Sequence, residues 1–466
     1  MNKSTRYNLT VVGSGPGGYV AACRAAQLEM KVAIVEADRP GGVCLNWGCI
    51  PTKALLKSAE MYEVLKKGGS FGLKADNVSY DLAAVVDRSR GISDRIVSGV
   101  EYLFRKYSIQ HIQGVGTLLS PNQVQVQNNG ETTVVESDYI IVATGARPRE
   151  LPHIRLDGER IIASKQAMTL KTLPARLAVI GAGAIGMEFA YYYRALGSEV
   201  TVLEALGRVL PVEDEEISKQ VARAFTRKGI QIETGAMVQS VQRDGDTVQL
   251  EYEVKGNKKR LEADIALMAI GVAPNIENLG LETVGVKTAK HGIAVNEHKQ
   301  TNIPSIYAIG DVIGPPWLAH AASAEGVHAV EHIAGRNPKP IDYNAIPGCT
   351  YCRPQVASVG YTEQRAKAEG IPYTVGRFEF KASGRAVAVG DTDGLVKLIF
   401  EKRYGGLIGA HIAGAEAPEM IHELVLAIQQ ECTAGEIGKA VHAHPTFGES
   451  IMEAALDAIG ERIHGA

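Results

Sequence analysis

Cys44 and Cys49 are the side chains in this sequence whose type and spacing most clearly indicate chemistry. They lie in residues 41–53, which lead into a stretch typical of a helix. Cysteines at the start of a helix suit reversible disulfide exchange, because the helix N-terminus stabilises the thiolate that attacks or leaves. A metal site would need two more ligands nearby and none follows, so the alternative is a pair of buried, inert thiols. Lys53, one helical turn after Cys49, either brings positive charge to this pair or is a solvated surface lysine.

A candidate acid–base pair, His444 and Glu449, lies far from the cysteines in sequence. A histidine followed five residues later by a carboxylate can form a base oriented by an acid, which is the arrangement that moves a thiol proton near neutral pH. The same spacing also occurs in purely structural hydrogen bonds, and the residue types alone leave both interpretations open. His442 would point to the opposite side of an extended segment, and we interpret it as structural.

Two glycine-rich loops predict the elements that must position these side chains. The first, residues 13–18, follows a β-rich run and precedes a helix expected over 19–28, and the next strand ends in Glu36. The second, residues 181–186, has the same surroundings and leads to Glu204, and in both copies the acid lies 23 residues after the first glycine. Such loops let a pyrophosphate approach a helix N-terminus, and the acid binds a ribose hydroxyl pair. The sequence therefore predicts two dinucleotide sites, with contacts at Gly13, Gly15, Gly18, Gly181, Gly183 and Gly186.

Three more apolar runs, residues 139–145, 265–271 and 305–311, are expected to be strands of the same α/β organisation. The third ends in Asp311, at the carboxyl edge where α/β sheets bind ligands, so Asp311 is expected to hold a cofactor hydroxyl. A further strand is expected over residues 349–356. It would place Cys349 and Cys352 on opposite faces, and we interpret them, like Cys23 and Cys432, as packing residues rather than a second redox or metal site.

Composition excludes several classes of protein. The 466 residues are 45% hydrophobic and 22% charged, which argues against disorder, a coiled coil or a fibre. The net charge of −3 and the lack of a long basic run argue against nucleic-acid or anionic-membrane partners. Six cysteines are too few for a disulfide scaffold, and neither a signal peptide nor a membrane-spanning segment is expected. We therefore expect a cytoplasmic protein.

The motifs, in their order and spacing, resemble the pyridine nucleotide-disulphide oxidoreductases along nearly the whole chain. Residues 44–53 carry the core Cys-Leu-Asn-x-Gly-Cys-Ile-Pro-x-Lys, and His444 begins a His-Pro-Thr sequence. Both are most similar to the members that reoxidise the lipoyl groups of 2-oxo acid dehydrogenase and glycine-cleavage complexes. The resemblance implies two Rossmann-like dinucleotide-binding domains plus a C-terminal α+β dimerisation domain. The expected limits are an FAD-binding domain at 1–147, an NAD-binding domain at 148–273, a central domain completing the FAD site at 274–345, and a dimerisation domain at 346–466.

The resemblance also implies the cofactors and the reaction. FAD belongs beside the cysteines, because electrons must pass between a disulfide and a hydride carrier. NAD belongs in the second site, where Glu204 would repel the 2′-phosphate of NADP, although Arg208 softens that preference. Cys44 would exchange with dihydrolipoamide and Cys49 would face the flavin. His444, oriented by Glu449, would reach the disulfide of the other subunit of an obligate homodimer.

Further contacts are carried over from the family in the same way. Glu188 would pair with Lys53 near the flavin. The remaining expected FAD contacts are Gly116, Thr144, Gly145, Ala319 and His320, and Gly271 is expected to contact NAD. The expected partner is a lipoyl-bearing acyltransferase or a glycine-cleavage carrier protein, and no metal is expected.

Two alternatives stay open. An NADPH-dependent reductase of a small disulfide such as glutathione would share the cysteines and the fold, but would favour basic residues in place of Glu204; a mercuric reductase would normally show extra C-terminal cysteines, which 452–466 lack. From a different class, the chain could be a non-catalytic binding subunit that has kept the fold. Flavin content and turnover distinguish it from an enzyme.

Overall fold

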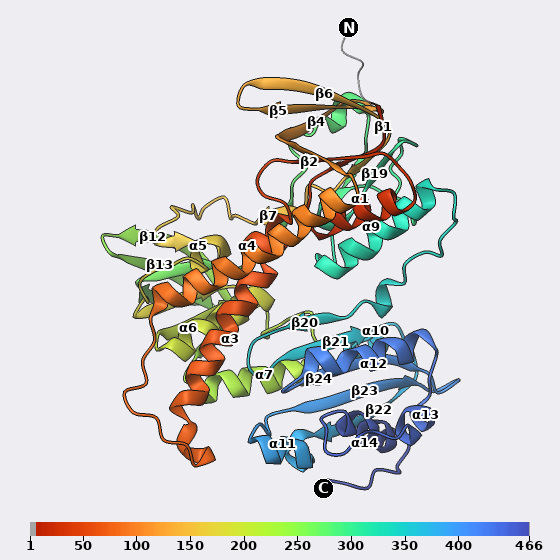
Figure 1. Cartoon of the computed structure of the whole chain (residues 1–466). Coiled ribbons are helices and arrows are strands. Elements are labelled where there is room, and N and C mark those ends of the chain that lie inside the picture. Colours follow the sequence, from red (N-terminus) through yellow and green to blue (C-terminus); the bar gives the residue numbers. More distant parts are fainter. Residues whose placement is uncertain (1–5, 466) are drawn as a thin grey trace. The chain divides into compact units, whose positions relative to one another are not determined.

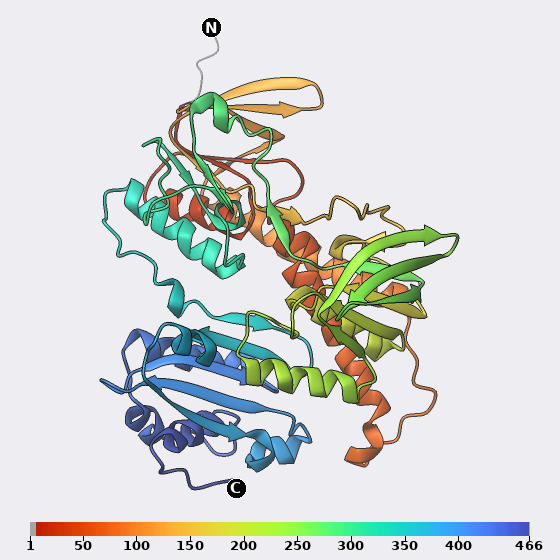
Figure 2. The same cartoon turned by 180° about the vertical axis from the view of Figure 1, so that it is seen from behind.

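The computed structural model describes residues 6–465, and the chain forms two compact units (Figures 1 and 2). The first unit takes the chain up to Ala54 together with residues 83–149 and 272–341. The second takes residues 55–82, 150–271 and the chain from Asp342 onward. Each unit is therefore assembled from segments that are far apart in the sequence. The four domain limits expected from the motifs stay a prediction.

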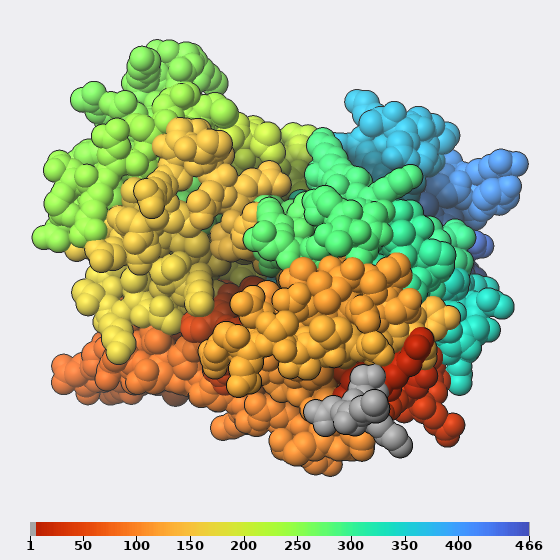
Figure 3. Space-filling model, turned by 90° about the horizontal axis from the view of Figure 1, so that it is seen from above, coloured from red at the N-terminus to blue at the C-terminus, as the bar shows by residue number. Residues whose placement is uncertain are grey.

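The first unit is built on a seven-stranded sheet with the order β3-β2-β1-β6-β5-β4, and β19 also pairs with β6. β1 pairs in parallel with β2 and β6, and its apolar residues from Leu9 to Val12 are buried, as expected for a strand covered on both faces. β4, β5 and the first residues of β6 reach the surface of this unit (Figure 3). The strands are β1 (Arg6–Val12), β2 (Val32–Glu36), β3 (Gln110–Gln113), β4 (Val115–Ser120), β5 (Gln123–Asn128), β6 (Glu131–Val142) and β19 (Ile306–Ala308).

Two helices of this unit, α1 (Pro16–Gln27) and α9 (Ala319–Ile333), pack closely against each other (Figure 1). A Cβ atom added to Gly326 would lie 2.6 Å from the carbonyl oxygen of Gly17, so only glycine allows this approach. The sheet and α1 thus hold the first glycine loop between them. The other elements of the unit are α2 (Gly42–Trp47), most of α4 (Leu82–Lys106), α8 (Leu281–Val284), β7 (Ala146–Pro148), β16 (Val272–Pro274), β17 (Thr288–Ala289), β18 (Gly292–Ile293) and a 3-10 turn, η2 (Gly310–Ile313).

Several element limits differ from the expected ones. α1 begins at Pro16 rather than at residue 19, because proline suits the first turn of a helix. The three apolar runs end as strands earlier than expected, at Val142, Met268 and Ala308. The glycines that follow them, at 145, 271 and 310, have positive φ angles of 70°, 102° and 72°, which an extended strand does not accommodate.

The second unit contains a five-stranded parallel sheet with the order β11-β10-β9-β15-β8. It repeats the strand–loop–helix arrangement of the first unit, with the second glycine loop between β9 and α6. An antiparallel hairpin, β13–β14, turns at Lys255 and Gly256. The elements are α5 (Ser164–Ala167), α6 (Ala184–Leu196), α7 (Glu215–Arg227), β8 (Ile161–Ile162), β9 (Arg176–Ile180), β10 (Glu199–Glu204), β11 (Gln231–Thr234), β12 (Ala236–Asp244), β13 (Thr247–Val254), β14 (Asn257–Ala263) and β15 (Ile265–Met268).

The C-terminal part of this unit is an antiparallel sheet with the order β20-β21-β24-β23-β22, and helices α12 and α14 share its hydrophobic core. α14 lies tightly on β22, where a Cβ on Gly376 would lie 1.8 Å from the carbonyl oxygen of Ala454. The elements are β20 (Gly348–Thr350), β21 (Val356–Gly360), β22 (Tyr373–Glu379), β23 (Leu395–Glu401), β24 (Leu407–Ala413), α10 (Glu363–Ala368), α11 (Gly384–Val389), α12 (Ala417–Gln429), α13 (Ala434–Lys439) and α14 (Glu449–Ala458).

The strand expected over residues 349–356 is wrong. Cys349 lies in β20 and pairs with Ala357 of the antiparallel strand β21, and the chain reverses between them. Pro354 lies in this reversal and has no N–H group to donate to a sheet. Cys352 is buried there, its thiol 3.2 Å from the carbonyl oxygen of Pro354, and neither cysteine forms a disulfide. Among residues 6–465, no helix is long and apolar enough to cross a membrane.

Candidate active site

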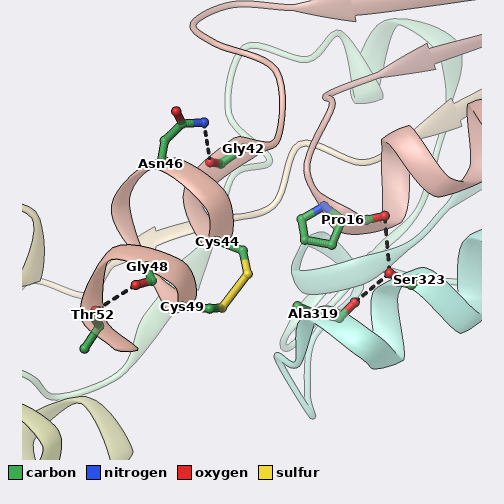
Figure 4. The surroundings of a disulfide bond; sticks show 9 residues. All are labelled: Pro16, Gly42, Cys44, Asn46, Gly48, Cys49, Thr52, Ala319 and Ser323. Carbon is green, nitrogen blue, oxygen red and sulfur yellow. Dashed lines mark hydrogen bonds between the residues drawn. A yellow bond between two sulfur atoms is a disulfide. The ribbon is translucent and has the colours of Figure 1, made fainter. Parts of the chain in front are cut away.

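Cys44 and Cys49 form a disulfide in the first unit, as the sequence predicts (Figure 4). Cys44 lies in the short helix α2, and Cys49 is the first residue of α3 (Cys49–Lys66), with Cα atoms 4.8 Å apart. Gly48 separates the two helices, so the chain turns between the cysteines and brings their side chains together. Cys49 is therefore at a helix N-terminus, where a thiolate is stabilised.

Hydrogen bonds hold residues 44–49, here called the redox loop, in place independently of the disulfide. The buried Asn46 side chain donates to the carbonyl oxygens of Pro40 and Gly42, each at 3.0 Å. The Thr52 hydroxyl donates to the carbonyl oxygen of Gly48 at 2.7 Å (Figure 4). Lys53 lies one turn into α3 and is half-buried. The segment joining the cysteines is thus tied to the chain on both sides.

The first glycine loop fits a dinucleotide pyrophosphate. Gly13 has φ +100°, and a Cβ on Gly18 would lie 2.0 Å from the Gly13 carbonyl oxygen. Gly15 is the N-cap residue of α1 and makes no side-chain cap, and a Cβ on Gly15 would meet nothing within 4 Å. Free N–H groups at an open helix N-terminus are suited to bind phosphate oxygens.

Glu36 stands beside this loop and is held by Ser14. One carboxylate oxygen accepts hydrogen bonds from the Ser14 backbone N–H at 2.9 Å and from its hydroxyl at 2.6 Å, and the other accepts from the Asp38 N–H. Sequence reasoning missed Ser14 as a positioning residue. A buried hydroxyl inside a glycine loop was the signal that could have found it.

The second loop repeats this geometry. Gly181 has φ +101°, a Cβ on Gly186 would lie 2.0 Å from the Gly181 carbonyl oxygen, and space around Gly183 is open. Glu204 accepts from the Ala182 N–H at 2.6 Å and from the Leu206 N–H at 2.8 Å. Its carboxylate is therefore fixed next to the loop.

Asp311 lies just after β19, in the 3-10 turn η2 of the first unit. Burial, with Glu325 nearby, raises the pKa of Asp311 to about 6. Glu325, which sequence reasoning missed, accepts from the Gly310 N–H at 2.6 Å and so holds this turn. Ala319 and His320 are the first residues of α9, whose N-cap residue Leu318 makes no side-chain cap.

The surroundings of the other expected cofactor contacts say less about a ligand. The Thr144 hydroxyl donates to the carbonyl oxygen of Asn275 at 2.9 Å, and space around Gly145 and Gly271 is open. Gly116 is packed inside β4, where a Cβ would lie 2.9 Å from Val12. Among the described residues, no group of three or more histidine, cysteine or acidic side chains could hold a metal ion.

His444 and Glu449 lie together in the second unit, with Nδ1 2.8 Å from Oε1. The other carboxylate oxygen of Glu449 accepts from the Thr446 N–H at 2.8 Å. Burial by itself would raise the pKa of Glu449, but the Thr446 N–H and His444 outweigh it and lower that pKa. Because the ionised carboxylate only accepts, Nδ1 of His444 carries the hydrogen and Nε2 of the neutral ring is left to accept a proton. The His444 side chain is 77% exposed, so this nitrogen is open to a substrate.

His442 is held differently. Its ring bonds to Glu423 at 2.9 Å and to the carbonyl oxygen of Ala440 at 2.9 Å, and the bond to Glu423 raises the pKa of His442. Both ring nitrogens are therefore used within the fold, which fits a structural role.

Comparison with known proteins identifies the family. Residues 7–326 match the family model described as pyridine nucleotide-disulphide oxidoreductase, and residues 346–455 match its dimerisation domain. The chain belongs to the pyridine nucleotide-disulphide oxidoreductases. Within this family, it is 45% identical over 463 residues to dihydrolipoyl dehydrogenase of Zymomonas mobilis, covering 98% of this chain and 99% of the relative. It is 41% identical to dihydrolipoyl dehydrogenase of Bacillus subtilis, covering 99% of this chain and 100% of the relative.

Two solved structures have the same fold as this chain. The crystal structure of LpdA from Mycobacterium tuberculosis matches with a TM-score of 0.90 at 29% identity, covering 97% of this chain and 99% of that one. The hypochlorous-acid-induced flavoprotein disulfide reductase RclA from Escherichia coli matches with a TM-score of 0.88 at 24% identity, over 97% of this chain and 99% of that one, and this shows the fold alone. The predicted fold class and the resemblance to dihydrolipoyl dehydrogenases are confirmed.

One family feature stays a prediction. Glu188 lies in α6 of the second unit, where it is buried and accepts from the Tyr351 N–H at 2.9 Å. Lys53 belongs to the first unit. The pairing of Glu188 with Lys53 that the family resemblance implies therefore remains an expectation.

Proposed function

We propose that this chain oxidises protein-bound dihydrolipoamide to lipoamide and reduces NAD+ to NADH. It would serve as the dihydrolipoyl dehydrogenase component of 2-oxo acid dehydrogenase complexes, glycine-cleavage complexes, or both. The Cys44–Cys49 disulfide carries this proposal, because it lies at a helix N-terminus in the same unit as the first dinucleotide loop. The near full-length similarity to dihydrolipoyl dehydrogenases supports it.

FAD binds at the first glycine loop with Glu36 and Asp311, and NAD binds at the second loop with Glu204. When bound, the flavin supplies the two-electron transfer between a dithiol and the nicotinamide, which no side chain can perform. Glu204 keeps a negative charge where the 2′-phosphate of NADP would lie. Arg208 donates from one guanidinium nitrogen to the carbonyl oxygen of Pro211 at 3.0 Å, which occupies part of the group that could otherwise bind a phosphate.

The protein groups perform the thiol chemistry. Nε2 of His444, from the partner subunit of a homodimer, takes a proton from one thiol of dihydrolipoamide. That sulfur attacks Cys44, the bond between Cys44 and Cys49 breaks, and Cys49 leaves as a thiolate. The second substrate thiol loses its proton to solvent, and its sulfur attacks the first substrate sulfur, which breaks the bond to Cys44 and releases lipoamide. Cys44 then takes the proton that His444 holds. Two electrons have then passed from the substrate to the cysteine pair.

Glu449→Gln should lower kcat for dihydrolipoamide oxidation roughly ten- to a hundredfold, because the amide no longer fixes the tautomer of His444 or stabilises its charged form. The Thr446 N–H and His444 lower the pKa of Glu449 from its ordinary value, so the carboxylate stays ionised and the deficit should persist across pH 5–8. Stopped assays of NADH formation across this pH range measure the loss of kcat. Glu423→Gln, which removes the charge from the partner of His442, is the matched control and should stay near the parent activity. Equal activity of Glu449→Gln and the parent would contradict the role of Glu449.

Glu204→Gln should raise KM for NAD+ about tenfold and improve the use of NADP+, while kcat changes little. The amide still accepts one backbone N–H but lacks the charge that repels a 2′-phosphate. Steady-state kinetics with both nucleotides measure the ratio of kcat/KM for NAD+ to kcat/KM for NADP+. Glu199→Gln, an exposed position at the start of β10, is the control. A parent enzyme that uses NADP+ as well as NAD+ would contradict the assignment of Glu204.

The function itself is tested by comparing two substrate pairs. The purified holoenzyme should reduce NAD+ with dihydrolipoamide and show little reduction of oxidised glutathione with NADPH. The reverse preference would make it a small-disulfide reductase, and bound flavin without turnover of either pair would make it a non-catalytic subunit. The proposed partners are a lipoyl-bearing acyltransferase or a glycine-cleavage carrier protein, and the proposed location is the cytoplasm.

A further inference from the structure

Arg90 of α4 holds the segment that joins the two redox cysteines. Its Nη1 donates to the carbonyl oxygen of Asn46, and its guanidinium lies over the Trp47 ring, with Cζ 4.1 Å from the ring centroid. Trp47 occupies the position between the cysteines that the motif leaves open. A planar cation that stacks and donates at the same time fixes a neighbour in both distance and orientation.

Other residues of α4 bind the same stretch of chain on either side. Asp94 accepts from Arg39 at 2.8 Å, before the redox loop, and Arg88 donates to the carbonyl oxygen of Ala54 at 3.1 Å, after it. Arg90 contacts the middle of this stretch. All of these contacts lie within the first unit.

The importance of Arg90 changes with the redox state of the cysteines. While the disulfide is closed, the covalent bond itself restrains residues 45–48. When it opens, that restraint is lost, and only non-covalent contacts keep the two thiols close. A contact that restrains the open loop raises the effective concentration of one thiol at the other, and so favours closure. Arg90, Asn46 and Thr52 are described side chains that contact this segment and can do this.

We propose that Arg90 is a positioning residue for the redox pair, which keeps the Asn46–Trp47 segment in place while the disulfide is open and so holds Cys44 and Cys49 ready to close again. This inference rests on the proposed dithiol–disulfide function of the pair. Closure removes two electrons and two protons from the dithiol, and oxidised dithiothreitol accepts both as it becomes the reduced dithiol.

The test is the equilibrium of the pair with dithiothreitol. Holoenzyme is equilibrated anaerobically with mixtures of reduced and oxidised dithiothreitol, trapped with N-ethylmaleimide, and analysed by mass spectrometry for alkylated Cys44 and Cys49. Arg90→Met keeps the aliphatic stem but removes the cation and the donors, and should shift the equilibrium toward the dithiol about tenfold. Arg90→Lys keeps the charge without the planar group, and should shift it in the same direction by about threefold. Arg95→Met, an exposed arginine of the same helix, should match the parent.

The direction of the shift separates positioning from electrostatics. If Arg90 acted only by its charge, its loss would disfavour thiolates and move the equilibrium toward the disulfide, and Arg90→Lys would match the parent. Either result, or an Arg90→Met equilibrium within about twofold of the parent, would overturn the inference. If Arg90→Met does not fold, Arg90→Lys decides by the same criteria. A parent pair that cannot be reduced reversibly would instead contradict the proposed function.

Discussion

Cys44→Ser should abolish dihydrolipoamide oxidation, with kcat/KM reduced roughly 10⁴-fold or more, because no sulfur remains to receive the attack of the substrate. NADH oxidation by ferricyanide needs only the flavin and nucleotide sites, so it should be retained. Both rates are measured on the same flavin-loaded preparation, which separates loss of the thiol from loss of the cofactor.

Cys432→Ser is the matched control, since Cys432 is a half-buried free cysteine at the core of the C-terminal sheet. It should keep both activities near the parent values. Dihydrolipoamide oxidation by Cys44→Ser at more than about a hundredth of the parent rate would contradict the proposed exchange at Cys44.

His444→Gln should lower kcat for dihydrolipoamide oxidation roughly 10²- to 10⁴-fold, because the substrate thiol loses its general base. The residual rate should rise with pH, since a thiol with a pKa near 8.5 ionises without help in alkaline solution. A pH–rate profile measures both effects. His442→Gln, two residues earlier in the same loop, should remain much closer to the parent at all pH values. Equal defects in the two variants would show a structural rather than a chemical role for His444.

The same two variants test whether the site is shared between subunits. A mixed dimer of Cys44→Ser and His444→Gln chains contains one site with both an intact disulfide and an intact histidine, if these come from different subunits. Unfolding and refolding an equal mixture should then restore about a quarter of the parent activity, because half of the dimers are mixed and each has one working site. If disulfide and histidine came from the same chain, mixing would restore nothing.

Local motifs predicted the two glycine loops and the helices that follow them, because the conformation of these loops depends on residues close together in the chain. Gly13 and Gly18, like Gly181 and Gly186, approach so closely that no other residue fits. The cysteine pair was predictable for the same reason. The ends of the strands were harder to predict, because Gly145, Gly271 and Gly310 have positive φ angles and three strands end before them. Residues 349–356 form a reversal and not a strand.

Contacts between distant residues could not be predicted. The bond from Arg90 to Asn46 joins residues 44 positions apart, and no local pattern marks either as a partner. Ser14 and Glu36 likewise meet only when β1 and β2 pair. In contrast, His444 and Glu449 are five residues apart and the sequence suggested their pairing, which the structure supports with a 2.8 Å contact.

The central claim is that electrons pass from dihydrolipoamide through Cys44 and Cys49 to a bound flavin and then to NAD+. The most direct measurement mixes the yellow holoenzyme anaerobically with dihydrolipoamide, records its long-wavelength absorbance, and then adds NAD+ or NADP+. We predict rapid growth of the absorbance typical of a thiolate beside oxidised flavin, followed by NADH formation with NAD+ and little reaction with NADP+. An unchanged spectrum with dihydrolipoamide, together with bleaching of the flavin by NADPH and turnover of another disulfide, would contradict the claim.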